Sequence, residues 1–241
     1  MKKIFAIAGL LALSITPTAS FADHLEPKES EIRPGGDLAH TNLKGRNLRD
    51  ANLKGANLED ADLKSAVLSG ADLKGASLDR ASLRVANLKD ADLKGAYLYN
   101  ADLRAANLNG ADLKGAVLSG ADLKGAFLRS TSLNEARLDG ADLNGADLNN
   151  ANLKDANLMD TSLKGAELKD TDLDGAYLQN ADLSGANLRG ADLHNARLIW
   201  VNLKGADLKG ANLYGSSSDL VHCPSSLPNG WFCENKTLIQ R

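Results

Sequence analysis

The chain has 241 residues, with 28 Lys and Arg against 31 Asp and Glu, so its formal net charge is −3. A protein that binds nucleic acid through a basic stripe carries a clear positive excess, and this balance argues against that class. The balance is also far from the strong acidity of a protein that imitates DNA. Only 4% of the residues are aromatic, so the positions of those few side chains are informative.

Residues 1–22 have the pattern of a secretory signal peptide. Two lysines follow the first Met, residues 4–15 are apolar, and Ser20-Phe21-Ala22 precedes Asp23. Small residues at the last and third-last positions predict cleavage after Ala22. A membrane span is the alternative, but the apolar run is shorter than the roughly 20 residues that a span needs. We therefore predict export without membrane insertion, to the periplasm or the extracellular space, or to the thylakoid lumen in a cyanobacterium.

Residues 23–35 form a polar leader with Pro27 and Pro34. The end of any stacked repeat array exposes unpaired backbone and apolar side chains, so something has to cover it. The leader is one candidate for an N-terminal cap. The alternative is a flexible tail, because Leu25 and Ile32 are its only large apolar residues.

From residue 36 to residue 215 a leucine recurs at every fifth position, from Leu38 to Leu213, in thirty-six consecutive units. Alanine stands two residues before the leucine in twenty-nine of them. The exceptions are Gly36, Thr41, Arg46, Thr131, Thr161, Thr171 and Val201. Because a large side chain at this cramped position overpacks the interior, Arg46 predicts an irregular first coil.

The five-residue period excludes ordinary secondary structure. On a helix the leucines would advance by roughly 140° beyond a full turn and leave no apolar face. On a straight strand an odd spacing would turn alternate leucines to opposite sides. The step of two from alanine to leucine suits one strand face, and the step of three to the next alanine requires a bend. Each unit is therefore predicted to be a very short strand followed by a corner.

The residues after each leucine support this interpretation. The second position after leucine is Gly, Asn or Asp in twenty-eight of the thirty-six units, and these residues tolerate turn dihedrals. A chain that bends in the same way every five residues coils into a solenoid, whose turns stack as parallel strands about 4.8 Å apart.

Units such as Ala111-Asp112-Leu113-Lys114-Gly115 resemble the pentapeptide-repeat proteins over about three quarters of the chain. The resemblance implies an all-β fold, a right-handed four-sided parallel β-helix with twenty residues per coil and about nine coils. The inward leucines would then form stacked columns. One such column contains Leu53, Leu73, Leu93 and Leu113.

Residues 216–241 supply the apolar side chains of a C-terminal cap. Cys223 and Cys233 lie ten residues apart in this segment, and in an oxidising compartment they are predicted to form a disulfide. The alternatives are a metal site with His222 or two free thiols. A second interpretation of the segment is a dimerisation surface, because some relatives associate end to end.

Residues twenty apart stack in columns if a coil has twenty residues. On two opposite sides the columns next to the leucines alternate acidic and basic, for example Asp92 and Asp112 beside Lys94 and Lys114. We interpret them as neutralising ladders on a solvated surface. A calcium site is disfavoured because the lysines occupy the same space as cations. No metal ligand or cofactor is predicted.

One of the two remaining sides collects aromatic, Met and Arg residues, which are typical of protein interfaces. The alternative is tolerated surface variation. We predict a partner-binding face for a protein of unknown identity. Its members are Tyr97, Tyr99, Val117, Arg137, Met159, Tyr177, Arg197, Ile199 and Trp200.

No catalytic constellation is present. The four histidines are scattered, and none has a zinc-ligand spacing or a neighbouring nucleophile arrangement. We expect a non-enzymatic, exported structural or protein-binding scaffold that binds no nucleic acid. One alternative follows relatives that resemble a DNA duplex and bind type II topoisomerases, and another is an assembly module that forms a homodimer through its C-terminal end.

Overall fold

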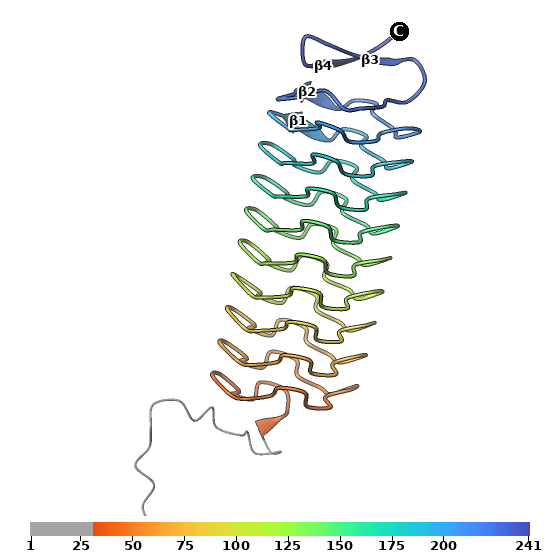
Figure 1. Ribbon diagram of the computed structural model, residues 1–241. Coiled ribbons are helices and arrows are strands. Elements are labelled where there is room, and N and C mark those ends of the chain that lie inside the picture. Colours follow the sequence, from red (N-terminus) through yellow and green to blue (C-terminus); the bar gives the residue numbers. More distant parts are fainter. Residues whose placement is uncertain (1–30) are drawn as a thin grey trace, which may run out of the picture.

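The computed structural model describes residues 31–241 and shows a straight rod of stacked coils (Figure 1). The predicted signal peptide and most of the predicted leader lie outside the described residues. The named strands are all near the C-terminal end of the rod. They are β1 (Arg197–Ile199), β2 (Ser217–Asp219), β3 (Trp231–Glu234) and β4 (Thr237–Gln240). Elsewhere each unit contributes one isolated bridge followed by a turn.

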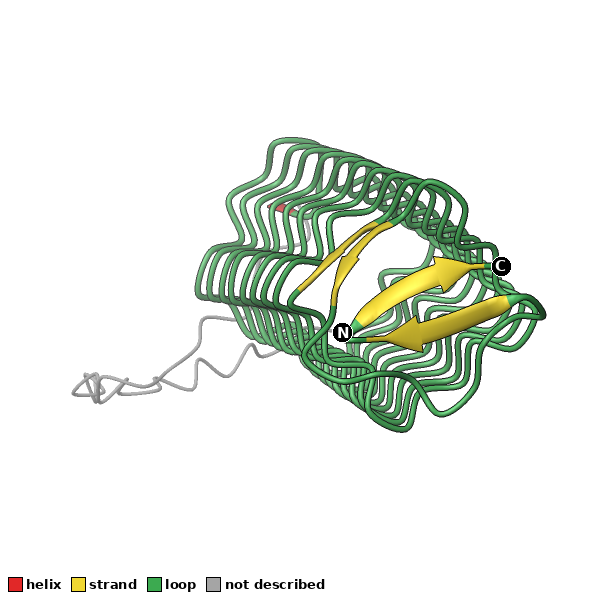
Figure 2. Ribbon diagram, turned by 90° about the horizontal axis from the view of Figure 1, so that it is seen from above, coloured by secondary structure: helices red, strands yellow, loops and turns green. Residues whose placement is uncertain are grey.

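Parallel bridges join residues twenty apart in the sequence along the whole repeat region. Asp92, for example, pairs with Asp72 on one side and with Asp112 on the other. The backbone N–H of Leu93 donates to the Asp112 carbonyl at 2.7 Å, and the N–H of Asp92 donates to the Ala71 carbonyl at 2.9 Å. Four five-residue units therefore make one turn of the chain, as the resemblance implied. Figure 2 shows the coils superimposed in the end-on view.

The interior of the rod is filled by the repeat leucines and alanines. Leu53, Leu73, Leu93 and Leu113, which lie twenty residues apart, are all completely buried. Where threonine replaces alanine, its hydroxyl donates to a leucine carbonyl. Thr161 Oγ1 bonds to the Leu158 carbonyl at 2.7 Å, and Thr131 Oγ1 bonds to the Leu108 carbonyl at 3.0 Å. A buried hydroxyl that is satisfied in this way avoids the desolvation penalty of an unpaired polar group.

Every corner of the repeat region has a left-handed backbone. The second residue after each leucine, from His40 to Gly215, has a φ between 53° and 77°. Glycine tolerates this conformation, and Asp and Asn tolerate it better than other residues. The repeat nevertheless forces Val85 and Trp200 into it, with φ values of 57° and 59°. The geometry of the coil therefore overrides local preference at these two positions.

At the N-terminal end Arg46 is half-buried at a position that alanine occupies elsewhere. An open cavity of about 560 Å³ lies beside it. Its lining residues are Ile32, Gly45, Arg46, Asn47, Leu48, Arg49 and Ala51. The backbone of this first coil is nevertheless regular, with bridges from Asn47 to Val67 and from Asn52 to Asp72. Arg46 therefore changes the side-chain packing at this end and leaves the backbone ladder intact.

At the C-terminal end the backbone ladder continues after the last repeat leucine. β1 and β2 pair in parallel, with Arg197 opposite Ser217, and a further bridge joins Asp207 to Ser226. β3 and β4 then form an antiparallel hairpin across the end of the rod (Figure 2).

The hairpin is attached to the rest of the rod by a hydrogen bond, a disulfide and apolar packing. The Leu220 N–H donates to the Lys236 carbonyl at 2.7 Å, so the hairpin hydrogen-bonds to the coil below. A disulfide joins Cys223 to Cys233, and Leu238 is buried against the core. Residues 216–241 therefore cover the end of the rod.

Candidate partner-binding face

The predicted face residues lie together on one side of the rod. Bridges connect Tyr97 to Val117 and Val117 to Arg137, and the same column continues through Asn157 to Tyr177 and Arg197. A parallel column two residues further along each coil contains Tyr99, Met159 and Ile199, and Trp200 occupies the adjoining corner. We call these nine predicted residues the aromatic strip. Five steps of about 4.8 Å give it a length of roughly 24 Å from Tyr97 to Arg197.

Three aromatic side chains of the strip are open to solvent, whereas Met159, Tyr177 and Ile199 are half-buried. The exposed fractions are 51% for Tyr97, 48% for Tyr99 and 59% for Trp200. The Arg197 guanidinium carbon lies 4.6 Å from the centre of the Tyr177 ring. This cation–π contact places the guanidinium over the Tyr177 ring, while Arg197 remains exposed to solvent. Along the strip apolar rings therefore alternate with cationic groups.

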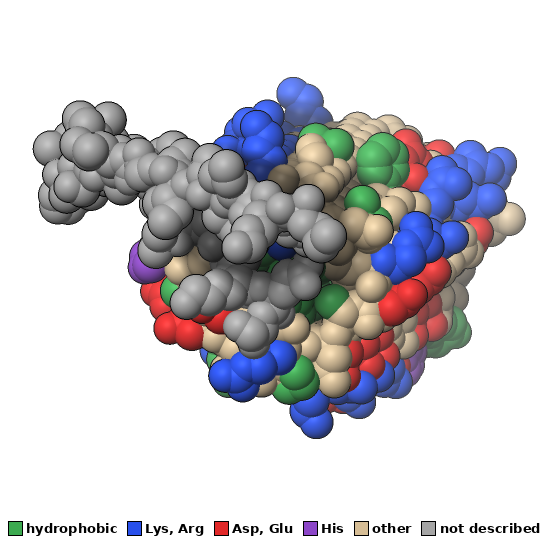
Figure 3. Space-filling model, turned by 90° about the horizontal axis from the view of Figure 1, so that it is seen from below, with side chains coloured by type: hydrophobic (Ala, Val, Ile, Leu, Met, Phe, Trp, Pro, Cys, Tyr) green, Lys and Arg blue, Asp and Glu red, His purple; other side chains and the backbone are tan. Residues whose placement is uncertain are grey.

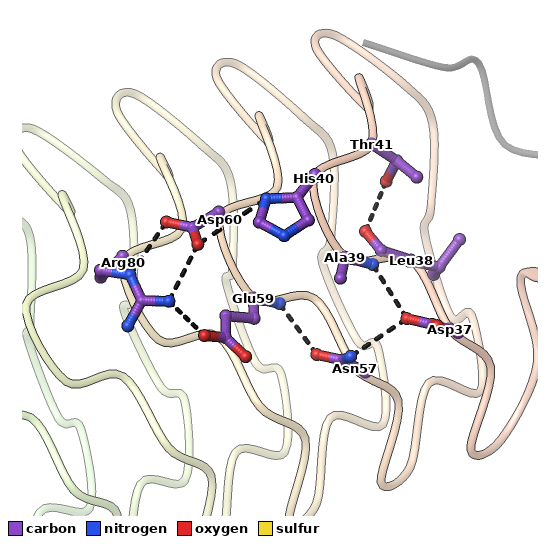
Figure 4. A network of polar contacts seen from close by, with 9 residues as sticks. All are labelled: Asp37, Leu38, Ala39, His40, Thr41, Asn57, Glu59, Asp60 and Arg80. Atoms are coloured by element: carbon purple, nitrogen blue, oxygen red, sulfur yellow. Dashed lines mark hydrogen bonds and ion pairs between the residues drawn. The ribbon is translucent and has the colours of Figure 1, made fainter.

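The N-terminal part of the same side is a charged network instead (Figure 4). Arg80 donates to both carboxylate oxygens of Asp60, at 3.1 and 2.9 Å, and also contacts Glu59. These bonds lower the pKa of Asp60, with the Arg80 hydrogen bond as the main cause. His40 Nδ1 lies 3.7 Å from Asp60 Oδ2. The polar network ends where the aromatic strip begins.

Two other sides of the rod carry ion pairs that cross from coil to coil. Lys74 Nζ lies 2.8 Å from Asp92, Lys94 Nζ lies 2.7 Å from Asp112, and Lys124 Nζ lies 2.8 Å from Asp142. The hydrogen bond to Asp92 raises the pKa of Lys74. Burial raises the pKa of Asp92, but the bonds from Lys74 and Lys94 outweigh it and the net pKa is lowered.

Figure 3 shows basic and acidic side chains next to one another along the rod. Because each acidic column is paired with a basic one, these sides present no extended field of one sign.

Several residues of the strip's surroundings were not singled out from the sequence. The hydroxyl of Ser119, a residue that is only 6% exposed, donates to Asp139 at 2.9 Å between the aromatic residues and Arg137. Gln179, beside Tyr177, has a buried Oε1 with no hydrogen-bond partner within residues 31–241. Both residues could have been identified from the twenty-residue coil length, because Ser119 and Gln179 lie in the same column as Tyr99.

A histidine contact was also missed. His194 Nδ1 lies 2.9 Å from Asp174 Oδ1, and Lys154 Nζ lies 2.7 Å from Asp174 Oδ2. The hydrogen bond from Lys154 is the main cause of the lowered pKa of Asp174, followed by the bond from His194. His194 and Asp174 are twenty residues apart, so their contact follows from the coil length. This cluster resembles the other ion-pair columns and contains no hydroxyl or thiol nucleophile.

Within residues 31–241, no group of three or more His, Cys, Asp or Glu side chains is arranged to hold a metal ion. The same residues contain no helix with the length and apolar character of a membrane span.

Comparison with known families gives one clear match. The family model described as "Pentapeptide repeats (8 copies)" matches overlapping segments that together run from residue 37 to residue 205. A search of curated proteins found no match.

The chain is also similar to several solved structures. HetL, a pentapeptide repeat protein involved in heterocyst differentiation regulation from Nostoc sp. strain PCC 7120, is 41% identical, with a TM-score of 0.75 over 77% of this chain and 86% of HetL. A trypsin-treated variant of QnrB1, a plasmid-mediated fluoroquinolone resistance protein, is 20% identical, with a TM-score of 0.49 over 82% of this chain and 90% of its own. A pentapeptide repeat protein from the Arabidopsis thaliana thylakoid lumen is 28% identical, with a TM-score of 0.19 over 54% of this chain and 69% of its own.

Proposed function

Because this chain belongs to the pentapeptide-repeat family, we propose that it is an exported, non-enzymatic scaffold that binds a partner protein along the aromatic strip. Proteins of this family form right-handed quadrilateral β-helices. The pairing of residues twenty apart supports a closed four-sided rod of about nine coils. Such a rod holds its outward side chains in straight rows, and a partner protein can contact several members of one row at once.

The observation that carries the proposal is the contrast between the aromatic strip and the charged ladders. On the ladders, lysines and aspartates are already paired with each other. The strip instead leaves Tyr97, Tyr99 and Trp200 about half exposed in one continuous column system. Exposed Tyr, Trp and Arg side chains provide most of the binding energy in protein interfaces.

The chemistry of the strip defines its partner as a polypeptide segment that offers apolar side chains and at least one carboxylate. Within residues 31–241 Arg197 forms no ion pair with a carboxylate, and its guanidinium lies over the Tyr177 ring. A planar guanidinium held in this way is suited to a partner carboxylate, which it can bind through two parallel hydrogen bonds. The neighbouring rings would cover apolar side chains on either side of that ion pair.

The test is a capture experiment with matched variants. The mature protein retrieves its partner from the envelope fraction of its own host, and the retrieved protein is identified, purified and titrated calorimetrically. Changing Tyr97, Tyr99 and Tyr177 together to Ser is expected to weaken binding by roughly a hundredfold or more. Arg197→Gln is expected to weaken binding and to reduce its dependence on salt.

The control is Phe127→Ser, because Phe127 is 48% exposed on a different side of the rod. This variant should bind as the natural protein does. Arg197→Gln and Phe127→Ser should retain the natural melting temperature within a few degrees, because single surface substitutions change stability little. The triple Tyr variant should remain folded, since three such small effects add up to only about 1.5 kcal/mol. Equal capture by the triple Tyr variant and the natural protein, or equal losses in the triple variant and Phe127→Ser, would contradict the proposed face.

Export is supported by the N-terminal sequence pattern and by the disulfide between Cys223 and Cys233, since disulfides persist mainly in oxidising compartments. We expect protein isolated from its natural host to begin at Asp23 and to fractionate outside the cytoplasm. N-terminal sequencing after fractionation checks this. Recovery of uncleaved protein from the cytoplasm would remove the export proposal without affecting the aromatic strip.

The two alternatives have weaker support. The cross-coil ion pairs neutralise the aspartates that a DNA-like surface needs, so a topoisomerase-binding role is the less favoured one. The cap exposes Val221 and Phe232, with exposed fractions of 39% and 45%. A homodimer through this end is distinguished by sedimentation of the mature protein at several concentrations.

A further inference from the structure

We propose that Asn229 is a site of spontaneous covalent modification, at which the chain converts the Asn229-Gly230 linkage into an aspartyl or isoaspartyl linkage. The sequence contains three Asn-Gly pairs, which are Asn109-Gly110, Asn144-Gly145 and Asn229-Gly230. An asparagine before glycine is chemically susceptible, because glycine has no side chain to hinder attack by its backbone nitrogen on the asparagine amide. The fold protects two of these pairs and leaves the third open.

The two pairs inside the repeats are clamped by the following coil. The Gly110 N–H donates to the Arg129 carbonyl at 2.9 Å, and the Arg129 N–H donates to Asn109 Oδ1 at 2.8 Å. Both the attacking nitrogen and the amide that it would attack are therefore held by the same residue. Reaction requires these bonds to open first.

The second repeat pair has the same arrangement. The Gly145 N–H donates to the Lys164 carbonyl at 2.9 Å, and the Lys164 N–H donates to Asn144 Oδ1 at 3.0 Å. The Ser162 hydroxyl lies 2.6 Å from the same Asn144 oxygen. A clamp from the residue nineteen or twenty positions ahead is thus a consequence of the coil length.

The pair in the cap has no such clamp. Asn229 and Gly230 are both exposed. Among residues 31–241 no hydrogen bond holds the Asn229 side chain or the Gly230 N–H. The Gly230 carbonyl accepts from the Arg241 N–H at 2.9 Å, but this contact leaves the nitrogen free to react.

The chemistry needs only water. The Gly230 nitrogen bonds to Cγ of Asn229, the Cγ–Nδ2 bond breaks, and ammonia leaves with the proton that the glycine nitrogen gives up. The product is a five-membered succinimide. Water then opens either of its two carbonyl–nitrogen bonds, which yields aspartate or isoaspartate. No oxidant, metal or enzyme takes part.

The modification would act on the cap and not on the coils. Isoaspartate adds one methylene group to the main chain and places a new carboxylate two residues before the start of β3. This segment lies inside the loop that the Cys223–Cys233 disulfide closes. Trp231, the next residue, packs against the core, and its ring lies 6.5 Å from that of Tyr214. The end of the rod is therefore the part that changes first as the protein ages.

The experiment compares the three pairs within one molecule. The mature, disulfide-bonded protein is kept at mildly alkaline pH and body temperature, in buffer and in denaturing urea, and samples are digested and analysed by mass spectrometry for replacement of the amide by a carboxylate. In buffer we expect Asn229 to convert roughly tenfold or more faster than Asn109 and Asn144, because the clamps have to open. In urea the three should convert at similar rates.

Two results would overturn the proposal. One is equal conversion of all three pairs in buffer, which would show that the hydrogen-bond clamps do not protect Asn109 and Asn144 from conversion. The other is an Asn229 that stays intact in buffer but converts in urea, which would show that the cap protects it as well. Asn229→Gln provides the check on the chemistry, since glutamine should remove the conversion at this position and leave Asn109 and Asn144 unchanged.

Discussion

Leu113→Ala is expected to lower the free energy of unfolding by about 2 to 5 kcal/mol. Leu113 is completely buried in the leucine column of the rod, and its backbone is bonded to the coil above through the Ser132 carbonyl at 2.7 Å. A solenoid cannot collapse around the resulting cavity, because the repeat backbone holds the walls apart. Urea unfolding followed by circular dichroism measures the change as a lower midpoint.

Leu113→Met is the matched control for this experiment. Methionine nearly conserves the volume of leucine, so its cost should stay below about 1.5 kcal/mol. In a solenoid the repeats unfold together only as long as the contacts between neighbouring repeats couple them. A lower slope of the urea transition would therefore mean that the two halves of the rod unfold separately. An Ala variant as stable as the natural protein would contradict the central burial of this column.

Gly110→Ala is expected to destabilise the rod more than Gly115→Ala does, although both glycines are corners with φ values of +71° and +65°. Alanine in the left-handed region costs about 1 to 2 kcal/mol at either position. A Cβ at Gly110 would additionally come within 2.3 Å of Asp90 Oδ1, while one at Gly115 would meet nothing within 4 Å. Moving the aspartate to a poorer rotamer adds about 0.5 to 1.5 kcal/mol.

The double variant Asp90→Ala with Gly110→Ala separates the two contributions. Without the carboxylate, Gly110→Ala should cost no more stability than Gly115→Ala does. Urea unfolding measures this by comparing the double variant with Asp90→Ala, and Gly110→Ala and Gly115→Ala with the natural protein. If Gly110→Ala and Gly115→Ala lower the free energy of unfolding by the same amount, the contact between Asp90 and a Cβ at position 110 does not affect stability.

Most of the fold could be predicted from the repeat itself. An unbroken leucine at every fifth residue is compatible with only one kind of backbone, so the core positions, the corners and the solenoid follow from Leu38 to Leu213 without other information. The left-handed corner at Val85 could not be predicted from its residue type, since valine disfavours that conformation. It follows only from the position of Val85 in the period.

The candidate face could be predicted in part. Once a coil of twenty residues was assumed, Tyr97, Val117 and Arg137 fell into one column, and the bridges place them there. The charged network of Arg80 with Asp60 and Glu59 on the same side was not predicted. Long, flexible side chains choose among several partners in the neighbouring coils, and the period does not specify which partner they reach.

The sequence by itself determined what lies inside this protein and where its chain bends, because burial and backbone dihedrals depend on the local five-residue unit. The tertiary structure alone decided what depends on neighbouring coils and on the cap: the carboxylate over Gly110, the clamps on Asn109 and Asn144, and the hairpin of β3 and β4. The physical reason is that these contacts join residues about twenty positions apart or lie beyond the repeats. A five-residue period fixes neither the length of the coil nor the path of the chain after the last leucine.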